Sequence, residues 1–118
     1  MHIGTDIIDI SRINKSLEKF GDKFKERFLL ADEIERAKKI ESIAGFWAAK
    51  EAISKALGCG ICSTLSFHDI IIQKDKRGAP YFTLSEKCLK IYPIKQSSLS
   101  ISHDGGFAIA VVIITLKT

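Results

Sequence analysis

The chain has few cysteines and no long apolar run, and both shortages narrow the class of protein. Three cysteines among 118 residues, an odd number, argue against a disulfide framework and favour a reducing compartment. The longest apolar stretch, 107–116, is too short to cross a bilayer, and its β-branched residues predict a buried strand. The first residues, 1–6, contain neither a basic segment nor a long apolar one. We therefore expect no secretory signal, no membrane span and a cytoplasmic location.

The composition is that of one folded domain with a basic surface. The chain is 46% hydrophobic and 27% charged, and its length suits a single domain over 1–118. The net charge is +4, with many lysines and arginines in the N-terminal third, and such a face suits nucleic acid, an anionic membrane surface or an acidic protein. Acidic residues interleave with the basic ones, which also fits an ordinary solvated helix surface.

The order of predicted elements indicates an α+β protein with a mainly antiparallel sheet. A strand at 2–9 is followed by a helix capped by Asp9 or Ser11, a short helical turn with Phe24 and Phe28, and a helix from Asp32 through Ile40. A fourth helix, capped by Ser42, carries Glu51 and Lys55 and ends at Gly58 and Gly60.

The second half of the chain is predicted to be mostly strands. A strand at 65–74 pairs with 81–83 through a turn at 76–80, and Ser85 caps a helix with Leu84, Cys88, Ile91 and Tyr92 on its buried side. Two more strands, 97–103 and 107–116, flank the hairpin signal Asp-Gly-Gly at 104–106. We find no repeat, linker or low-complexity segment.

Three charged residues suggest a site for a metal and a phosphate. Glu51 and Lys55 stand one helical turn apart on one face. Asp6 lies in an otherwise apolar strand, where a carboxylate must be at an exposed end, paired, or bound to a cation. Two carboxylates with open coordination positions suit Mg²⁺, and a lysine beside them can neutralise charge on a transferring phosphoryl group.

Other chemistry-bearing residues admit plainer interpretations. Cys59 and Cys62 form a C-x2-C pair that Cys88, His68 and His103 could complete as a zinc site. No second pair with metal-ligand spacing accompanies them, so small apolar residues beside a glycine turn are the simpler interpretation. His103 shares a strand face with apolar residues, where a histidine is more often structural than catalytic, although its place at a hairpin mouth allows ligand contact.

In this order, these residues resemble the holo-acyl-carrier-protein synthases, the small single-domain class of 4′-phosphopantetheinyl transferases. The core of the resemblance is the run A-A-K-E-A-x-S-K-A-x-G-x-G at 48–60. The other matching segments are Gly-Thr-Asp-Ile at 4–7, Phe-Lys-Glu-Arg-Phe at 24–28, Leu-Ser-Phe-His-Asp-Ile at 65–70, Gly-Ala-Pro at 78–80 and Ser-Ile-Ser-His at 100–103. The likeness covers nearly the whole chain. One departure is Phe46-Trp47, where family members commonly have a basic residue and phenylalanine; Lys38, Lys39 or Lys50 are candidates to substitute for that basic residue.

The resemblance implies an activity, a fold and a homotrimer. The reaction would move 4′-phosphopantetheine from coenzyme A to a serine of an apo-acyl carrier protein in fatty acid biosynthesis, releasing adenosine 3′,5′-bisphosphate. Asp6 and Glu51 would bind Mg²⁺, Glu51 would accept the serine proton directly or through a metal-bound water, and Lys55 would stabilise the transition state. The active site would lie at a subunit interface, with Trp47 beside the pantetheine path or simply in the core.

Two substrate-binding surfaces also follow from the resemblance. Coenzyme A would be bound by Lys50, Lys55, Gly58, Ser102 and His103, the last two across the interface. The acidic carrier protein would dock on Arg12, Lys23 and Arg27.

Two other functions compete with this one. A basic nucleic-acid-binding domain should show fewer acidic breaks over 12–39, so we expect no nucleic acid partner; a metal-dependent phosphohydrolase should show a second cluster of metal ligands.

Overall fold

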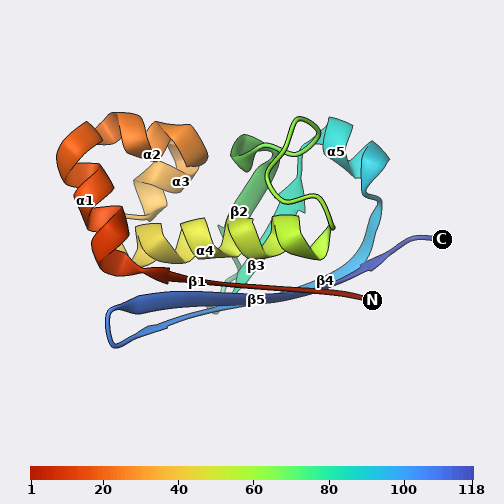
Figure 1. The fold of residues 1–118 in the computed structure, drawn as a ribbon. Helices are drawn as coiled ribbons and strands as arrows, with labels where there is room; N and C mark the ends of the chain where they lie inside the picture. The colour runs from red at the N-terminus through yellow and green to blue at the C-terminus, as the bar shows by residue number, and fades with distance from the viewer.

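A long central helix lies across a three-stranded sheet, with short helices and a two-stranded sheet around its other sides (Figure 1). The computed structural model describes residues 1–118. Its elements are β1 (His2–Asp9), α1 (Ile10–Phe20), α2 (Asp22–Phe28), α3 (Ala31–Arg36), α4 (Ile40–Ala56), the 3-10 turn η1 (Phe67–Asp69), β2 (Ile70–Lys74), β3 (Pro80–Leu84), α5 (Glu86–Ile91), β4 (Ile94–Asp104) and β5 (Phe107–Leu116). The predicted α+β class with antiparallel sheets is confirmed.

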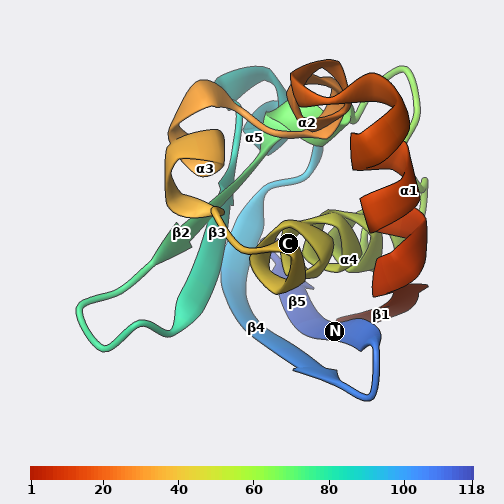
Figure 2. The ribbon, with the colours of Figure 1, turned by 90° about the vertical axis from the view of Figure 1, so that its left-hand side faces the viewer.

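The main sheet has the order β1-β5-β4, and all its pairs are antiparallel. The hairpin between β4 and β5 turns at Gly105 and Gly106, which have φ of 57° and 86°, as the Asp-Gly-Gly signal predicts. Figure 2 looks nearly along α4 and shows β1, β5 and β4 beneath it, with the β2–β3 hairpin extending to one side. No helix is both long and apolar enough to span a membrane.

Two glycines allow α4 to lie directly on the main sheet. A Cβ atom on Gly4 of β1 would overlap the carbonyl oxygen of Ala52, and one on Gly45 would come within 2.9 Å of Ile101 in β4. Alanines on α4 keep the separation small, and Ala48, Ala49 and Ala52 are completely buried. Because the contact leaves no room for side chains at these points, the path of α4 over β1 and β4 is fixed.

Strand β5 is buried on one face only, which corrects the prediction of a fully buried strand. Ala108, Ala110, Val112 and Ile114 face α4 and are buried, whereas the alternate residues Phe107, Ile109, Val111 and Ile113 are 39–45% exposed. On neighbouring β1, Ile3 and Ile7 are also exposed. The register aligns these side chains across the two strands, so the outer face of the sheet carries a continuous apolar surface.

Several predicted element ends are wrong. Helix α4 begins at Ile40 after Lys39 rather than at Ser42, and α3 ends at Arg36 rather than at Ile40. Residues 65–74 are not one strand, because the Asp69 carboxylate accepts the Ser66 backbone N–H (2.9 Å) and holds 67–69 in a 3-10 turn. In α5, Ile91 is 53% exposed, although it was predicted to be buried. Strand β4 begins at Ile94 rather than at the predicted residue 97.

Other boundaries are as the sequence predicts. Strand β1 spans 2–9, and Asp9 is the cap of α1, where its carboxylate accepts the Ser11 backbone N–H at 2.9 Å. Gly21, with φ of 61°, ends α1, and Phe24 and Phe28 of α2 are buried. These short N-terminal elements bring the chain back over α4, where they complete the core on the side away from the sheet.

Candidate active site

The predicted charged residues Asp6, Glu51 and Lys55 come together where β1 lies against the second half of α4. Asp6 points to the inner face of the sheet, where its strand partner is Ala110. The Lys55 ammonium donates to Asp6 Oδ1 at 2.8 Å and to the Thr5 carbonyl at 3.2 Å. Glu51 lies one turn earlier on α4. The small residues beneath them, including Gly4, allow the helix close enough for the ion pair to form.

The electrostatics of the cluster are those of two carboxylates sharing one cation. Burial and the negative charge of Asp6 both raise the pKa of Glu51, and the charge of Lys55 partly offsets them. Asp6 has only 14% of its side chain exposed, whereas Lys55 has 51% exposed. Two carboxylates close enough to repel, with one flexible lysine beside them, favour an added positive charge.

The donor set fits Mg²⁺ and does not fit zinc. Asp6 and Glu51 offer only hard oxygen donors, and no third histidine, cysteine or carboxylate joins them. Magnesium retains water and takes phosphate oxygens, so a two-carboxylate set with open positions is suited to it. The alternative zinc site at Cys59, Cys62 and Cys88 with His68 and His103 is not assembled, since nowhere do three such ligands meet.

A separate cavity of about 200 Å³ opens at the other end of α4. Ser42 and Phe46 of α4, Lys74 of β2 and His103 of β4 are among its lining residues. None of Asp6, Glu51 and Lys55 lines it. Along the helix, Glu51 comes five residues after Phe46, the nearest lining residue on α4, which is a rise of about 7.5 Å at about 1.5 Å per residue. Lys74, His103 and Phe46 could contact an anionic, aromatic ligand here, although Glu41 also lines the opening and adds negative charge.

The structure brings together some of the residues predicted to bind coenzyme A and separates others. Gly58 follows directly on α4, and its backbone N–H donates to the Lys55 carbonyl at 3.0 Å. His103 lines the cavity instead. Ser102 is opposite Ile109 on the outer face of the sheet. Within one chain, therefore, Ser102 and His103 do not join Lys55 and Gly58.

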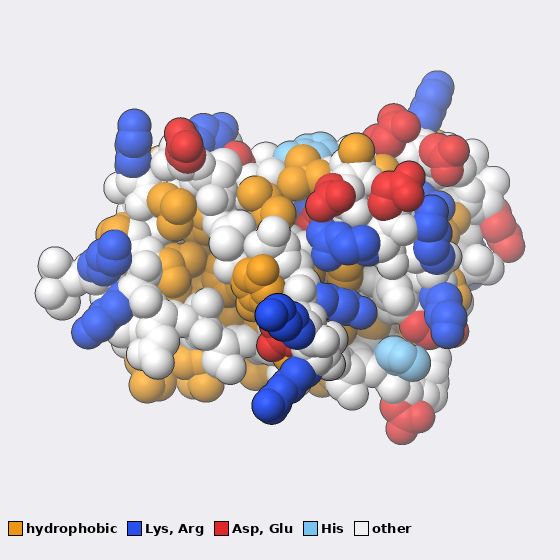
Figure 3. Space-filling view, turned by 180° about the vertical axis from the view of Figure 1, so that it is seen from behind, with side chains coloured by type: hydrophobic (Ala, Val, Ile, Leu, Met, Phe, Trp, Pro, Cys, Tyr) orange, Lys and Arg blue, Asp and Glu red, His pale blue; other side chains and the backbone are white.

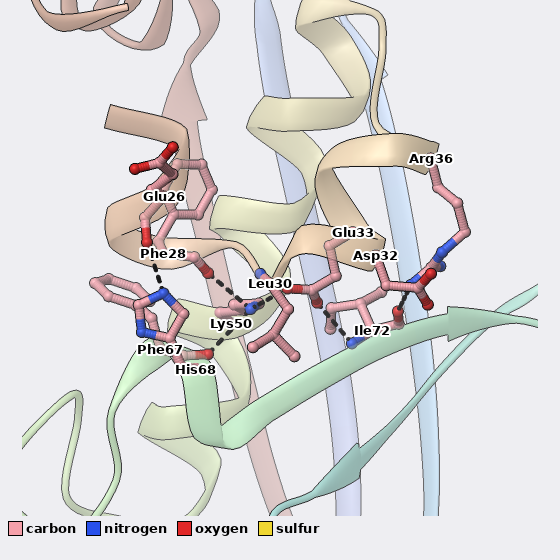
Figure 4. A network of polar contacts seen from close by, with 10 residues as sticks. All are labelled: Glu26, Phe28, Leu30, Asp32, Glu33, Arg36, Lys50, Phe67, His68 and Ile72. Carbon is pink, nitrogen blue, oxygen red and sulfur yellow. Dashed lines mark hydrogen bonds and ion pairs between the residues drawn. The ribbon is translucent and has the colours of Figure 1, made fainter. Parts of the chain in front are cut away.

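The prediction that Lys50 binds coenzyme A is wrong, because this side chain is completely buried. Figure 4 shows its ammonium among acceptors of three neighbouring segments. Its ammonium donates to Glu33 Oε1 at 2.7 Å, to the Phe28 carbonyl at 2.7 Å and to the Phe67 carbonyl at 3.0 Å. All three N–H donors are thereby used. Burial lowers the pKa of Lys50, and the charge and hydrogen bond of Glu33 oppose that effect. Lys50 also cannot substitute for the basic residue missing at Phe46.

Glu33, to which the sequence assigned no role, is the centre of this buried network. Its Oε1 accepts the Leu30 backbone N–H at 2.8 Å, and its Oε2 accepts that of Ile72 at 2.9 Å (Figure 4). The carboxylate thus ties α3 to β2 while Lys50 ties both to α4. One signal was present in the sequence: Lys50 falls four residues after Phe46 and three before Ile53, on the buried side of the helix.

The residues predicted to dock the carrier protein are exposed on α1 and α2. Arg12 and Lys23 face solvent, and the Arg27 guanidinium lies 4.7 Å from the centre of the Phe20 ring. Seen from behind, the molecule shows acidic and basic side chains close together over the side that carries the short helices (Figure 3). The surface is therefore mixed in sign, as the interleaved sequence predicts.

Trp47 belongs to an aromatic cluster in the core. Its ring centre lies 6.0 Å from that of Phe24, 5.1 Å from that of Phe28 and 5.0 Å from that of Phe67. The contacts join α2 and η1 to α4 on the side of the helix away from the sheet. They support the simpler of the two interpretations of Trp47, a residue of the hydrophobic core.

Comparison with known proteins places this fold and site in one class of enzyme. The model of the 4′-phosphopantetheinyl transferase superfamily matches residues 2–112. The holo-acyl-carrier-protein synthase of Sulfurovum sp. (strain NBC37-1) is 63% identical over 117 residues, covering 99% of this chain and 98% of that protein. That of Aliarcobacter butzleri (strain RM4018) is 58% identical over 115 residues and 98% of each chain.

A solved structure agrees with the sequence relatives. The crystal structure of the Helicobacter pylori holo-acyl-carrier-protein synthase in complex with coenzyme A superimposes with a TM-score of 0.92. It is 52% identical and covers 96% of this chain and 99% of that one. The chain therefore belongs to the holo-acyl-carrier-protein synthase family of 4′-phosphopantetheinyl transferases, which confirms the resemblance seen in its sequence.

Proposed function

We propose that this protein transfers 4′-phosphopantetheine from coenzyme A to a serine of an apo-acyl carrier protein, in a magnesium-dependent step of fatty acid biosynthesis. Adenosine 3′,5′-bisphosphate is the second product. The observation that carries the proposal is the cluster of Asp6, Glu51 and Lys55 on one end of α4, in a chain of this family. Residues 1–118 act as a single transferase domain, and the predicted cytoplasmic location stays a prediction.

Glu51 accepts the proton of the attacking serine hydroxyl. Burial and the charge of Asp6 raise the pKa of Glu51, which makes its carboxylate a stronger base than an exposed glutamate. Deprotonation increases the nucleophilicity of the serine oxygen, which then attacks the β-phosphate of coenzyme A. Lys55, whose side chain is half exposed, stabilises the negative charge that develops on the phosphoryl oxygens.

Asp6 and Glu51 are the proposed Mg²⁺ ligands. Their oxygen donors and their mutual repulsion support this assignment. When bound, Mg²⁺ would supply positive charge at the phosphate under attack and at the leaving group. Asp6 also holds Lys55 in place, since the ion pair of 2.8 Å aims the ammonium toward the carboxylates.

The coenzyme A site is completed by a second copy of the chain, in a homotrimer. Lys55 and Gly58 hold the reacting end of coenzyme A, and Ser102 and His103 of the adjoining copy hold its nucleotide end. Two observations support this arrangement: the cluster lies on the second half of α4 whereas the His103 cavity borders its first half, and the outer face of the main sheet is apolar. Hydrophobic side chains lie along the left part of the lower margin of Figure 3, where the sheet runs in Figure 1.

The acidic carrier protein docks on Arg12, Lys23 and Arg27. These side chains are exposed on neighbouring helices, and long-range attraction between opposite charges accelerates association. Reversal of charge in Arg12→Glu should raise the KM for the carrier protein, and more so at low salt, where screening is weakest. An unchanged KM at low ionic strength would remove Arg12 from the docking surface.

Intact-mass measurement of the carrier protein tests the proposed function directly. The protein is incubated with coenzyme A, Mg²⁺ and an apo-acyl carrier protein, with a parallel reaction containing EDTA. A gain of one phosphopantetheine that disappears with EDTA is the expected result. No gain on several apo-carriers, with circular dichroism showing a folded enzyme, would contradict the proposal.

A further inference from the structure

The loop that follows α4 gathers two thiols and two hydroxyls that the proposed reaction does not use. The Tyr92 hydroxyl donates to Cys59 Sγ at 3.3 Å and lies 3.2 Å from Thr64 Oγ1. Thr64 Oγ1 in turn lies 3.2 Å from Cys62 Sγ. The two thiols are therefore joined through a short chain of polar contacts, and each contributes to the pKa of the other.

Neither core packing nor metal binding accounts for this pair. Cys59 is exposed and Cys62 is half-buried, whereas Cys88 is completely buried. A structural metal site needs a third and fourth ligand, and no additional histidine, cysteine or carboxylate lies beside the pair. Two accessible thiols in a C-x2-C segment are instead the arrangement found in dithiols that cycle through a disulfide.

The two sulfurs differ in the way a reactive pair requires. Hydrogen bonding to the side chain and backbone of Thr64 lowers the pKa of Cys62. Partial burial raises the pKa of Cys59, with a smaller opposing effect from the Tyr92 hydroxyl. Cys62 is therefore the better source of thiolate, and Cys59 is a protonated neighbour able to resolve an oxidised sulfur.

The backbone around Cys59 can adjust to a short S–S bond. Gly58 and Gly60 flank this residue with φ of 89° and 65°, in a region that glycine enters at little cost. Cys62 is held more firmly, because its N–H donates to the Leu65 carbonyl at 2.9 Å and its carbonyl accepts the Leu65 N–H at 3.2 Å. One anchored sulfur and one on an adaptable turn can close to bonding distance without moving the rest of the fold.

We propose that Cys59 and Cys62 form a reversible intramolecular disulfide in response to a hydroperoxide. The Cys62 thiolate attacks the terminal oxygen of the peroxide, breaks the O–O bond and becomes a sulfenic acid, while the leaving hydroxide or alkoxide takes up a proton. The Cys59 thiol then attacks that sulfur, and its proton leaves with the displaced hydroxide as water. With hydrogen peroxide, two thiols and one peroxide give one disulfide and two waters.

The disulfide would act on the segment that directly follows Lys55. Gly58, the residue before Cys59, donates its N–H to the Lys55 carbonyl at 3.0 Å, and Gly60 donates to the Ser54 carbonyl at 3.1 Å. The oxidised loop would therefore be tied both to the last turn of α4 and to itself. Formation of the disulfide does not depend on the proposed transferase activity and is measured without it.

Thiol counting by mass spectrometry on the full-length protein tests the inference. Reduced protein is treated with a small excess of hydrogen peroxide, quenched with catalase, unfolded and alkylated with iodoacetamide. We expect alkylatable thiols to fall from three to one, with a mass loss of about 2 Da before alkylation and full recovery after dithiothreitol. Peptide mapping should place the disulfide between Cys59 and Cys62.

Single substitutions identify the pair and its roles. Cys59→Ser and Cys62→Ser should each abolish the mass loss, and Cys59→Ser should accumulate oxygen adducts on Cys62. The matched control Cys88→Ser, at a buried thiol, should behave as the wild type. Three thiols still alkylated in the wild type under conditions that oxidise glutathione would overturn the inference. So would a mapped disulfide that contains Cys88, or one that joins two chains.

Discussion

At the scale of single residues, Glu51 has the most demanding role in the proposed reaction. Glu51→Gln removes the base but keeps the size of the side chain, so transfer to the carrier protein should fall by at least about 100-fold. The protein should still fold, because the Glu51 side chain forms no hydrogen bond in the structure and its negative charge is repelled by that of Asp6. Turnover by intact mass and the melting temperature are the two measurements.

The exposed Glu86→Gln in α5 is the control for Glu51→Gln, and it should leave both quantities unchanged. Near-normal transfer by Glu51→Gln would show that another group accepts the serine proton. A large drop in its melting temperature would instead indicate that Glu51 has a structural role.

The buried pair of Lys50 and Glu33 should matter for stability far more than a surface pair does. Lys50→Met leaves the Glu33 carboxylate buried without its partner, so the free energy of unfolding should fall by about 3–5 kcal/mol. Urea denaturation measures this. The matched control is Lys38→Met, which removes the exposed ion pair with Glu35 at 4.0 Å and should change the free energy by less than about 1 kcal/mol.

A double substitution separates charge burial from packing in the same network. Glu33→Leu combined with Lys50→Met removes both buried charges, and should recover much of the stability lost in Lys50→Met alone. The backbone N–H groups of Leu30 and Ile72 would still lose their acceptor, so recovery should be incomplete. If Lys50→Met and Lys38→Met were equally mild, the buried network would not be the stabilising feature that its geometry indicates.

These residues also show what can be predicted from sequence at this scale. Asp6, Glu51 and Lys55 could be grouped because a carboxylate in an apolar strand needs a partner, and an (i, i+4) pair on a helix points to one side. Lys50 was misassigned because its charge was weighed without its position on the buried side of α4. Its partner Glu33 is 17 residues away in sequence, and nothing local predicts that the two side chains meet.

At the scale of elements, Asp69 joins η1 to α5. Its carboxylate accepts the Ser66 N–H at 2.9 Å, the Ser66 hydroxyl at 3.0 Å and the Ser85 hydroxyl at 2.8 Å. Burial alone would raise the pKa of Asp69, but these hydrogen bonds and the charge of Lys87 outweigh it and lower the pKa from 3.8 to about 2. Since the folded pKa lies below the unfolded one, Asp69 stabilises the protein above pH 4 or so and loses that effect as the pH falls toward about 2.

Asp69→Asn should therefore reduce the free energy of unfolding by about 2 kcal/mol near neutral pH. The difference from the wild type should shrink between about pH 4 and pH 2, because the wild-type carboxyl is then protonated as well. Chemical denaturation at a series of pH values gives both curves, and Asp104→Asn, on the exposed β4–β5 hairpin, is the control. If the two proteins differed by the same free energy of unfolding at all pH values, the loss of stability would come from the asparagine amide rather than from the missing charge.

The middles of elements were easier to predict than their ends. The strands at 2–9 and 107–116 follow from hydrophobic pattern and flanking turns, and the structure has both. The start of α4 was misplaced because Ser42 looks like a cap, whereas the helix begins two residues earlier without any side-chain cap. The strand at 65–74 was overextended because the local pair of Ser66 and Asp69, whose backbone and side-chain hydrogen bonds form the 3-10 turn, was not recognised as a turn signal.

At the scale of the whole molecule, the proposed active site has two parts along α4. The charged cluster is near its end, and the cavity with His103 is near its beginning. The outer rows of the main sheet align Ile3 with Ile113 and Ile7 with Ile109, all exposed. Apolar surface of this kind is typical of permanent interfaces between subunits, so the sheet face and the divided site both favour self-association.

Val111→Lys places a charge in the middle of that face and should dissociate the assembly. Burying an unpaired ammonium in an apolar interface is strongly unfavourable, whereas in the isolated chain Val111 is 41% exposed and a lysine there can reach water. The wild type should elute in size-exclusion chromatography with light scattering at three times the 13.1 kDa of one chain, and Val111→Lys at one times that mass. The matched control is Ile91→Lys on α5, an apolar residue away from the sheet that is 53% exposed, and this variant should remain associated.

Transfer activity of the same variants connects assembly to the site. If Lys55 and Gly58 need the His103 cavity of an adjoining copy, a folded Val111→Lys monomer should bind coenzyme A weakly and lose transfer, although its own cluster of Asp6 and Glu51 is untouched. The Val111→Lys variant is then mixed with inactive Glu51→Gln subunits at high protein concentration. Transfer activity should return if Val111→Lys only lacks the half-site of a partner, and should not return if its own site is damaged. A wild type that is monomeric and fully active would show instead that both ends of α4 work within one chain.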